Sequence, residues 1–224
     1  MFRLIKKIFI YLFVFQLAYI IVCRWIDPPF TITQIVNLVS GYGLQRDYIN
    51  YDEMGRNCKL AVMASEDQLF PDHDGFDIKS IKKAIKYNEK HPHKTRGAST
   101  ISQQTAKNVF LWQHGGFLRK GLEVYFTFMI ELVWGKERIL ETYLNVAEMG
   151  KGIFGIQAAS KAYFNKDAKN LSRREAAMIA ACLPNPKKFP VKPACSYVNF
   201  RASKIVNQMN NLEGDSDIEA LLKK

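Results

Sequence analysis

An almost unbroken apolar run near the N-terminus is the strongest pattern in the chain. Residues 8–23 are apolar except for Gln16, and other apolar positions flank this run. A helix needs about 20 apolar residues to cross the hydrocarbon core of a bilayer. Lys6 and Lys7 are compatible with such a helix, because long basic side chains can reach the membrane surface. The pattern therefore predicts one transmembrane anchor within residues 1–26.

Charges on the two sides of the apolar run predict its orientation. Arg3 and two lysines precede the run, whereas only Arg24 lies near its far end, before Asp27. Cytoplasmic flanks of membrane helices carry the excess of Lys and Arg. We therefore expect a cytoplasmic N-terminus, a single passage through the cytoplasmic (inner) membrane, and a domain on the extracytoplasmic face. A cleaved signal peptide is the alternative, and the lack of a small-x-small cleavage site disfavours it.

Beyond the anchor, apolar positions recur at helical spacing almost everywhere, and no segment has a convincing strand pattern. Helices are predicted over residues 77–86, 100–110, 117–134, 136–147, 172–183 and 197–212. The first is amphipathic, with Ile on one face and Lys on the other, and the third is expected to be a long core helix. We infer a single all-α domain over residues 27–213, followed by a polar, frayed tail over residues 214–224.

A glycine pair, Gly115 and Gly116, interrupts the helical pattern before the long helix. The apolar side chains that flank this loop are Phe110, Leu111, Trp112 and Phe117. They either insert into lipid or pack in the core, and the pattern leaves both alternatives open.

The composition is that of a folded protein, and the charge distribution narrows the choice of partners. The 224 residues are 48% hydrophobic with a net charge of +11, which excludes a disordered or fibrous chain. Residues 79–120 contain ten Lys and Arg against one Glu, so an anionic partner is expected there. Nucleic acid is disfavoured, because no nucleic-acid-binding signature appears. Anionic lipid or a phosphorylated lipid substrate fits better, although the lysines of residues 79–86 also fit a solvated helix face.

Cysteine and histidine positions indicate neither a disulfide framework nor a zinc site. Three cysteines follow the anchor, Cys58, Cys182 and Cys195, and an odd number does not form a complete set of pairs. A bridge between the last two is one interpretation, and burial as small apolar side chains is the favoured one. No Cys and His pair has the spacing of a zinc site.

Carboxylates at two places are candidates for chemistry. Glu66 and Asp67 end an apolar helical segment next to a loop, a position typical of the edge of a cleft. Glu123 follows Arg119 and Lys120 at spacings of four and three. A helix-surface ion pair is the alternative interpretation of that second group.

Between these carboxylates, the segment that begins at residue 100 carries a polar stripe. Thr100, Gln104 and Lys107 fall at positions i, i+4 and i+7 of the predicted helix. A hydroxyl, an amide and an ammonium group at a helix N-terminus suit phosphate and sugar hydroxyl groups.

Five blocks resemble, in order, the signatures of the peptidoglycan glycosyltransferases. They are Glu66-Asp67-Gln68-Leu69-Phe70-x-x-His73-x-Gly75-Phe76-Asp77, Gly97-Ala98-Ser99-Thr100-Ile101-Ser102-Gln103-Gln104-Thr105-Ala106-Lys107-Asn108, Arg119-Lys120-Gly121-Leu122-Glu123, Arg138-Ile139-Leu140-Glu141-x-Tyr143-Leu144-Asn145 and residues 155–164. Ala98 and Thr105 depart from the commonest family residues, and Thr105 with the short chain resembles the monofunctional branch. No transpeptidase activity is expected, because no Lys-Thr-Gly motif accompanies the Ser-x-x-Lys match at Ser80.

The resemblance implies a lysozyme-like, mostly helical fold and the polymerisation of lipid II. The 4-hydroxyl of one lipid II sugar would attack the anomeric carbon of the growing glycan, giving a β-1,4 bond with inversion and releasing undecaprenyl pyrophosphate. Glu66 would be the general base of this reaction. Lys107, Arg119 and Lys120 would neutralise the leaving group. Glu123 would be a second catalytic carboxylate that positions these cations or a divalent ion, Mg²⁺ or Mn²⁺.

The resemblance also implies a set of substrate-binding residues: Asp67, Phe70, His73, Ser99, Thr100, Gln103, Gln104, Lys107, Asn108, Arg119 and Lys120. The first three would shape the loop beside Glu66, and the others would hold sugars and phosphates. The expected partners are lipid II, the lipid-linked glycan, the membrane and other proteins of cell-wall synthesis.

Two other functions are alternatives to this transferase activity. A lysozyme-like or lytic glycan hydrolase also uses a catalytic Glu, but cleavage of an uncharged bridge needs no basic block to hold a pyrophosphate. A non-catalytic scaffold of cell-wall assembly is disfavoured by the presence of both Glu66 and Glu123 within complete motifs.

Overall fold

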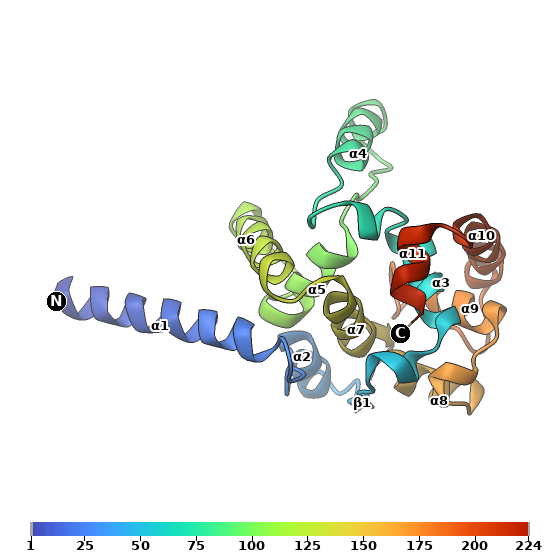
Figure 1. Ribbon diagram of the computed structural model, residues 1–224, viewed down its shortest axis with the longest axis horizontal. Helices are drawn as coiled ribbons and strands as arrows, with labels where there is room; N and C mark the ends of the chain where they lie inside the picture. The colour runs from blue at the N-terminus through green and yellow to red at the C-terminus, as the bar shows by residue number, and fades with distance from the viewer. Residues whose placement is uncertain (1, 224) are drawn as a thin grey trace.

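The computed structural model describes residues 2–223, and its first helix stands apart from the others. Helix α1 (Phe2–Val22) projects away from the rest of the molecule (Figure 1). Among the described residues, it is the one helix long and apolar enough to cross a membrane, and nearly all of its side chains are exposed. This agrees with the predicted anchor, although the helix ends at Val22 rather than at residue 26.

The C-terminal part of α1, from Gln16 onward, packs against the domain. Ile20 and Cys23 are completely buried. The indole N–H of Trp134 donates a hydrogen bond to the carbonyl of Ile20 at 2.7 Å, and Nε of Arg138 donates to the carbonyl of Cys23 at 3.0 Å. The last turn of the anchor is therefore part of the folded domain.

Helix α3 (Arg56–Glu66) lies at the centre of the core. Every residue from 58 to 64 is buried, as expected for a helix surrounded by protein. Helices α9 (Arg173–Cys182) and α10 (Ser196–Leu212) pack against it, and α8 (Ile156–Phe164) lies next to α9. The alanines of α9 allow the close approach, because they add little volume between the helix backbones.

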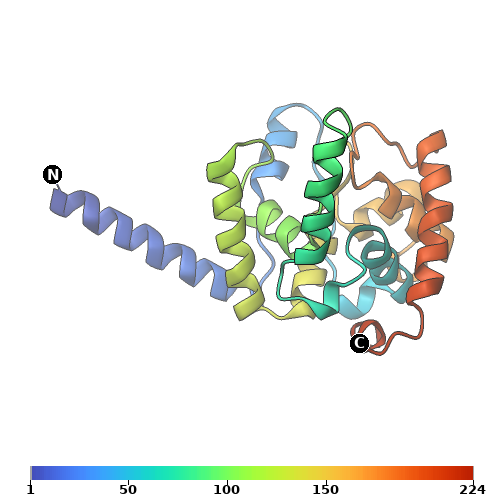
Figure 2. The same ribbon diagram turned by 90° about the horizontal axis from the view of Figure 1, so that it is seen from above.

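A second group of helices lies between this core and α1. Helix α5 (Ile101–Phe110) packs against both α6 (Phe117–Val133) and α7 (Lys136–Val146), and α2 (Ile32–Val39) contacts α5. Figure 2 shows α6 lying between the projecting α1 and the rest of the domain. Short 3-10 turns complete the helical part: η1 (Tyr51–Met54), η2 (Phe70–Asp72) and η3 (Ala168–Asn170).

The predominantly helical fold is confirmed, but a small sheet was not predicted. Strands β1 (Gln45–Arg46), β2 (Glu148–Gly150) and β3 (Ile153–Phe154) form a sheet in the order β1-β3-β2, parallel between β1 and β3 and antiparallel between β2 and β3. Strands of two or three residues are too short to show the alternating pattern that identifies a strand in a sequence.

Helix α6 is not the core helix that its periodicity predicted. Its fully buried residues are Glu123, Thr127 and Ile130, and the half-buried Phe126 and Val133 pack against the core, whereas five other large apolar side chains are exposed. These exposed side chains are Phe117, Leu118, Val124, Phe128 and Leu132. The helical period was correct, but the apolar face of α6 points away from the domain.

The C-terminal segment is also more ordered than predicted. Helix α11 (Ser216–Leu222) is capped by the Asp215 side chain, and it buries Ile218, Leu221 and Leu222. The Tyr51 hydroxyl donates to the carbonyl of Leu221 at 2.7 Å. The expectation of a frayed tail was wrong, because three apolar residues at spacings of three and four dock this short helix on the core.

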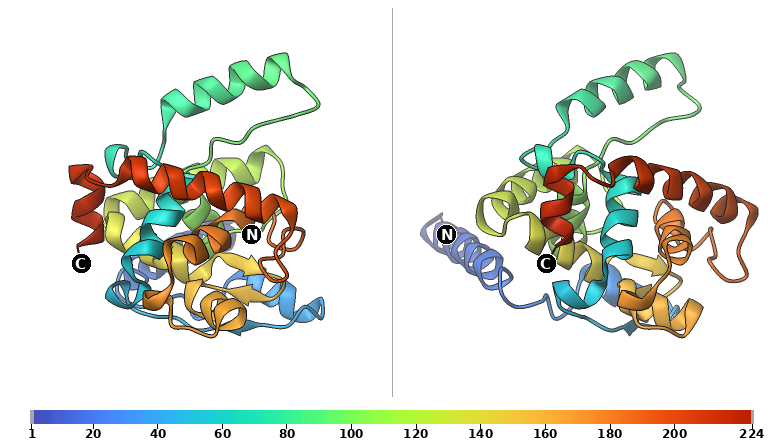
Figure 3. Two further views of the ribbon diagram at one scale, coloured as in Figure 1. Left: turned by 90° about the vertical axis from the view of Figure 1, so that its right-hand side faces the viewer. Right: turned by 45° about the vertical axis from the view of Figure 1, so that its right-hand side comes forward.

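Helix α4 (Ile78–Lys90) projects with its following loop from the side of the domain (Figure 3). The amphipathic pattern and the Asp77 cap were predicted, and the Asp77 side chain accepts a hydrogen bond from the backbone N–H of Ser80 at 2.9 Å. No residue of α4 is buried, so its isoleucine face is only loosely covered.

The four cysteines are free thiols in the structure. Cys58 and Cys182 are buried, as the favoured interpretation predicted, and Cys195 is half-buried. The bridge between Cys182 and Cys195 is not present.

Candidate active site

Glu66 is the last residue of α3, at the edge of a large cavity. One carboxylate oxygen accepts a hydrogen bond from the Ser65 hydroxyl at 3.0 Å, and the other accepts one from Nε2 of Gln104 at 2.9 Å. The cavity has a volume of about 790 Å³ and is also lined by Ser99, Pro184 and Arg201. Glu66 is half-buried, so its carboxylate is both held in place and accessible from the cavity.

Asp67 connects the end of α3 to the start of α5. The residue leaves the helical conformation, with φ −161°, and its side chain accepts a hydrogen bond from the backbone N–H of Ile101 at 3.0 Å. A carboxylate is favourable at a helix N-terminus, where backbone N–H groups lack partners within the helix. Asp67 thereby sets the position of α5, the helix that carries Gln104 toward Glu66.

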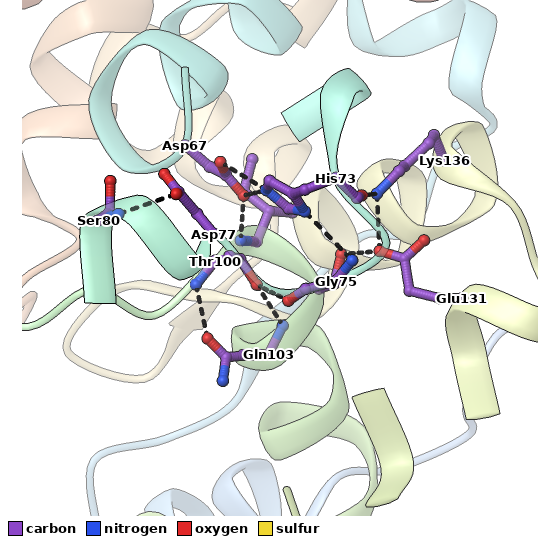
Figure 4. A network of polar contacts seen from close by, with 11 residues as sticks. Asp67, His73, Gly75, Asp77, Ser80, Thr100, Gln103, Glu131 and Lys136 are labelled. Carbon is purple, nitrogen blue, oxygen red and sulfur yellow. Dashed lines mark hydrogen bonds and ion pairs between the residues drawn. The ribbon is translucent and has the colours of Figure 1, made fainter. Parts of the chain in front are cut away.

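His73 extends this connection through a network of polar contacts, shown in Figure 4. Nε2 of His73 lies 3.0 Å from a carboxylate oxygen of Asp67, and the backbone N–H of Gly75 donates to Nδ1 at 3.1 Å. Because Nδ1 accepts a hydrogen bond, Nε2 carries the proton and donates to Asp67. Gly75 has φ +85°, and a Cβ there would lie 2.8 Å from Cγ2 of Thr127, so the turn requires glycine.

Thr100 and Gln103 form a capping box at the start of α5. The Thr100 hydroxyl donates to the carbonyl of Gly75 at 2.7 Å and accepts from the backbone N–H of Gln103 at 3.1 Å. The Gln103 side chain in turn accepts from the N–H of Thr100. Both side chains are buried, as are Asp67 and Phe70. These four residues support the loop and α5 through contacts within the fold, and Asp67 and Thr100 also line the larger cavity.

The predicted ion pair on α6 is present. Nη1 of Arg119 lies 2.6 Å from one carboxylate oxygen of Glu123, and the Lys120 ammonium contacts the other oxygen. Glu123 is only 3% exposed, and its two cations keep this buried carboxylate from being unpaired. With two cations for one anion, the cluster has a net positive charge.

Lys107 links this cluster to Glu66. Burial lowers the pKa of the Lys107 ammonium, while the Glu123 carboxylate raises it. The charges of Arg119 and Lys120 lower this pKa further, and that of Glu66 raises it, so all five groups lie within electrostatic range. Within residues 2–223, the Lys107 ammonium forms no hydrogen bond or ion pair, which leaves its donors free for a ligand.

A smaller cavity of about 170 Å³ adjoins the first. It is lined by Lys107 and Asn108, and Gln104 lines both cavities. The side chain of Asn108 accepts a hydrogen bond from Gln113 at 3.1 Å. Gln104 therefore lies between a cavity beside the carboxylate of Glu66 and a cavity beside the ammonium of Lys107.

Three residues of these cavities were missed in the sequence. Glu148 lines the smaller cavity; burial raises the pKa of its carboxyl, although Lys187 lies 3.7 Å away. Arg201 lines the larger cavity and donates to the carbonyl of Ser65, 136 positions earlier, a proximity with no local sequence signal. Tyr143 belongs to the fourth motif block, but the sequence did not indicate a role for it.

A divalent ion near Glu123 would find few protein ligands. Both oxygens of Glu123 contact cations. The described part of the chain also holds no cluster of three or more His, Cys, Asp or Glu side chains able to bind a metal. The residues around Glu123 therefore do not fit a metal site formed by protein ligands, and the positive charge there comes from Arg119 and Lys120.

Comparisons with known proteins identify the family of the chain. Residues 33–210 match the family model described as Transglycosylase. A biosynthetic peptidoglycan transglycosylase of Haemophilus influenzae is 48% identical over 202 residues, covering 87% of this chain and 82% of that protein. Proteins of the same name from Pseudomonas entomophila and Citrobacter koseri are 48% and 45% identical, covering 90% and 96% of this chain and 87% and 91% of their own lengths.

Proposed function

The chain belongs to the transglycosylase family and is a peptidoglycan glycosyltransferase, and on that basis we propose that Glu66 is the general base of lipid II polymerisation. The observation that carries this assignment is the position of the carboxylate at the edge of the larger cavity, within electrostatic range of the Lys107 ammonium in the adjoining one. Each carboxylate oxygen of Glu66 accepts one hydrogen bond and keeps a lone pair with which to take a proton.

The proposed step transfers one proton and exchanges one bond. Glu66 takes the proton of the acceptor sugar's 4-hydroxyl, and that oxygen forms a bond to the donor's anomeric carbon. The bond between this carbon and the pyrophosphate oxygen breaks, and the pyrophosphate leaves with the electron pair. Attack from the opposite face inverts the configuration at the anomeric carbon.

Positive charge around the leaving group is the second requirement. Pyrophosphate gains negative charge as the bond breaks, and fixed cations stabilise this charge without reorganising during the step. Lys107 supplies an unpaired ammonium, and Arg119 and Lys120 supply further charge while Glu123 holds them in place. Ser99, Gln104 and Asn108 are proposed to contact sugars and phosphates, because each lines one of the cavities.

Two observations support association with the membrane: α1 is long and apolar enough to span it, and the family synthesises peptidoglycan. We propose that α1 crosses the cytoplasmic membrane once, with the N-terminus in the cytoplasm, because the basic residues precede the apolar run. A reporter enzyme fused to the C-terminus should then be active only outside the cytoplasm. Activity of this fusion in the cytoplasm would reverse the proposed orientation.

The exposed apolar faces of α6 and α2 are proposed to lie in the lipid beside α1. Phe117 is 99% exposed and Leu118 is 78% exposed on α6, and α2 presents Val36 and Val39. An apolar surface of this kind is typical of contact with a membrane. Of the four side chains flanking the glycine loop, Trp112 and Phe117 are exposed, whereas Leu111 is buried and the ring of Phe110 stacks on Phe126. Insertion into lipid is therefore proposed for Trp112 and Phe117, and packing within the domain for Phe110 and Leu111.

Incubation of the purified full chain with lipid II in detergent tests the proposed function. Polymerisation gives long glycan strands and free undecaprenyl pyrophosphate, which gel electrophoresis and chromatography resolve. Release of small fragments from preformed glycan would instead indicate the hydrolase, and the absence of both activities would indicate the scaffold. Reconstitution with other cell-wall synthesis proteins then tests whether they are partners.

A further inference from the structure

Glu66 is connected by hydrogen bonds to a buried tyrosine on another helix. The Tyr143 hydroxyl, from α7, donates to Oε1 of Gln104 at 3.2 Å, and Nε2 of Gln104 donates to Glu66 at 2.9 Å. Tyr143 is 1% exposed, so its hydroxyl has little access to water. Three helices thus contribute to one chain of contacts that ends on the carboxylate.

The amide of Gln104 has two orientations of nearly equal shape and opposite polarity. With the amino group toward Glu66, it donates a hydrogen bond to the carboxylate. With the carbonyl toward Glu66, two acceptors would face each other and the carboxylate would lose a donor. A hydroxyl that donates to the amide oxygen from the other side favours the first orientation.

We propose that Tyr143 is a positioning residue that sets the orientation of the Gln104 amide and thereby the placement of Glu66 for proton transfer. This inference rests on the proposed function of Glu66 as the base, and it adds a residue that acts on the base through another side chain. Tyr143 acts through Gln104, because its hydroxyl forms its hydrogen bond with that side chain.

The hydroxyl of Tyr143 is suited to act as a permanent donor. Burial raises the pKa of Tyr143 well above its usual range, and the negative charge of Glu66 raises it further. The hydroxyl therefore keeps its proton at neutral and moderately alkaline pH. Replacing Tyr143 by Phe removes this one donor and retains the buried ring.

A double-mutant cycle on the full chain in detergent tests the inference. Tyr143→Phe should lower kcat for lipid II polymerisation about tenfold, within the range of coupling energies between contacting residues, with KM changed less than about twofold. In a Gln104→Ala background, the same substitution should change kcat less than about twofold, because the residue through which it acts is gone. Tyr51→Phe is a matched control, since the Tyr51 hydroxyl also donates to an oxygen inside the fold, far from Glu66.

Two results would overturn the inference: an unchanged kcat in Tyr143→Phe, or an equal loss of kcat in both backgrounds. A purely structural role would lower the midpoint of thermal unfolding and reduce activity equally with and without Gln104. The cycle is separable from the proposed function, because polymerisation by the unaltered chain and its loss in Glu66→Gln test the latter.

Hydrogen exchange of the Gln104 side-chain amide in the unaltered chain provides a test that requires neither turnover nor the folding of a variant. A Gln104 amide held between Tyr143 and Glu66 should exchange at least tenfold more slowly than the side-chain amide of the exposed Gln45, whose side chain forms no hydrogen bond within the described residues. Equal exchange rates would show that Gln104 is not held, and they would overturn the inference whatever the substrate of the enzyme.

Discussion

The two sides of the site, the side of Glu66 and the side of Lys107, are held in opposite ways. Glu66 lies where α3 and α5 meet, and the side chains around it are hydrogen-bonded to one another. Within the part of the chain that the structure describes, the Lys107 ammonium has no such partner, and Arg119 and Lys120 near it stand on α6, which exposes several large apolar side chains. Glu66 is positioned by hydrogen bonds within the fold, whereas the ammonium of Lys107 is left available for a ligand.

This difference matches the chemistry proposed for each side. A general base must be held at hydrogen-bonding distance from one proton, so a rigid network favours it. A cationic side chain that binds phosphate forms its charge-assisted hydrogen bonds only when the ligand is bound. In the proposed position of α6 beside the membrane, these cations would also lie near the surface at which lipid-linked phosphates are expected.

The largest expected effect on turnover is at Glu66. Glu66→Gln should lower kcat by about two to four orders of magnitude, because the amide keeps the shape of the side chain and cannot take a proton. Binding of lipid II, measured by fluorescence titration, should survive. Glu89→Gln, on the exposed surface of α4, is the control. Turnover within tenfold of the unaltered chain would show that Glu66 is not the base.

Truncation tests whether the boundary between anchor and domain is where the structure places it. A chain that begins at Asp27 loses the buried Ile20 and leaves the indole of Trp134 without its acceptor. Lost burial and an unpaired donor together should reduce the free energy of unfolding by about 3–5 kcal/mol.

A chain that begins at residue 17 is the matched comparison, because it keeps the last turn of α1. It should unfold at nearly the same temperature as the full chain in detergent and still polymerise lipid II there. On vesicles at low enzyme concentration it should be slower, because it is no longer held near its substrate. If both truncated chains are equally stable, the last turn of α1 contributes nothing to the fold.

Loss of positive charge on the Lys107 side of the site should lower kcat/KM. Lys107→Ala or Arg119→Ala should lose about 2–4 kcal/mol of transition-state stabilisation, the scale for removal of one electrostatic donor. Lys82→Ala, on the exposed face of α4, should do little. Measured kcat/KM values that fall equally in all three variants would mean that the effect is general electrostatics rather than contact with the leaving group.

The pH dependence should distinguish Lys107 from an ordinary lysine. Because its pKa is lowered by burial, the ammonium loses its charge, and with it its attraction for phosphate, as the pH rises through a value below the usual lysine range. The kcat/KM of the unaltered chain should therefore fall at alkaline pH. In Lys107→Arg this alkaline fall should move to higher pH, since guanidinium stays charged. An identical profile in both proteins would contradict this role.

The smallest expected effect lies within the membrane part. Gln16, the single polar residue of the apolar run, donates to the Tyr125 hydroxyl of α6 at 2.8 Å. Hydrogen bonds between membrane helices contribute about 0.6 kcal/mol on average, so Gln16→Leu should lower the thermal midpoint in detergent only slightly. Tyr125→Phe should have the same effect, and the double variant should lose no more than either single one.

Local patterns predicted most helices and the location of the site along the chain. Helical spacing identified the segments that became α4, α5, α6, α7, α9 and α10, and the motif blocks contained Glu66, Gln104, Lys107 and Glu123. These features depend on residues close together in sequence, where the helical period and the residue types needed for chemistry can be read directly. The outward face of α6 could not be predicted, because periodicity does not distinguish a protein neighbour from a lipid one.

The sequence by itself determined the anchor, the helical class and the residue types of the site, since the length of an apolar run, a period of 3.6 and a motif are properties of the local chain. Only the tertiary structure decided that Thr100 and Gln103 are caps, that Arg201 reaches the cavity and that Tyr143 meets Gln104. Each of these depends on which distant segment lies opposite a side chain. The packing of whole helices determines which segments lie opposite each other, because the free energy gained by burial depends on all the residues in the interface.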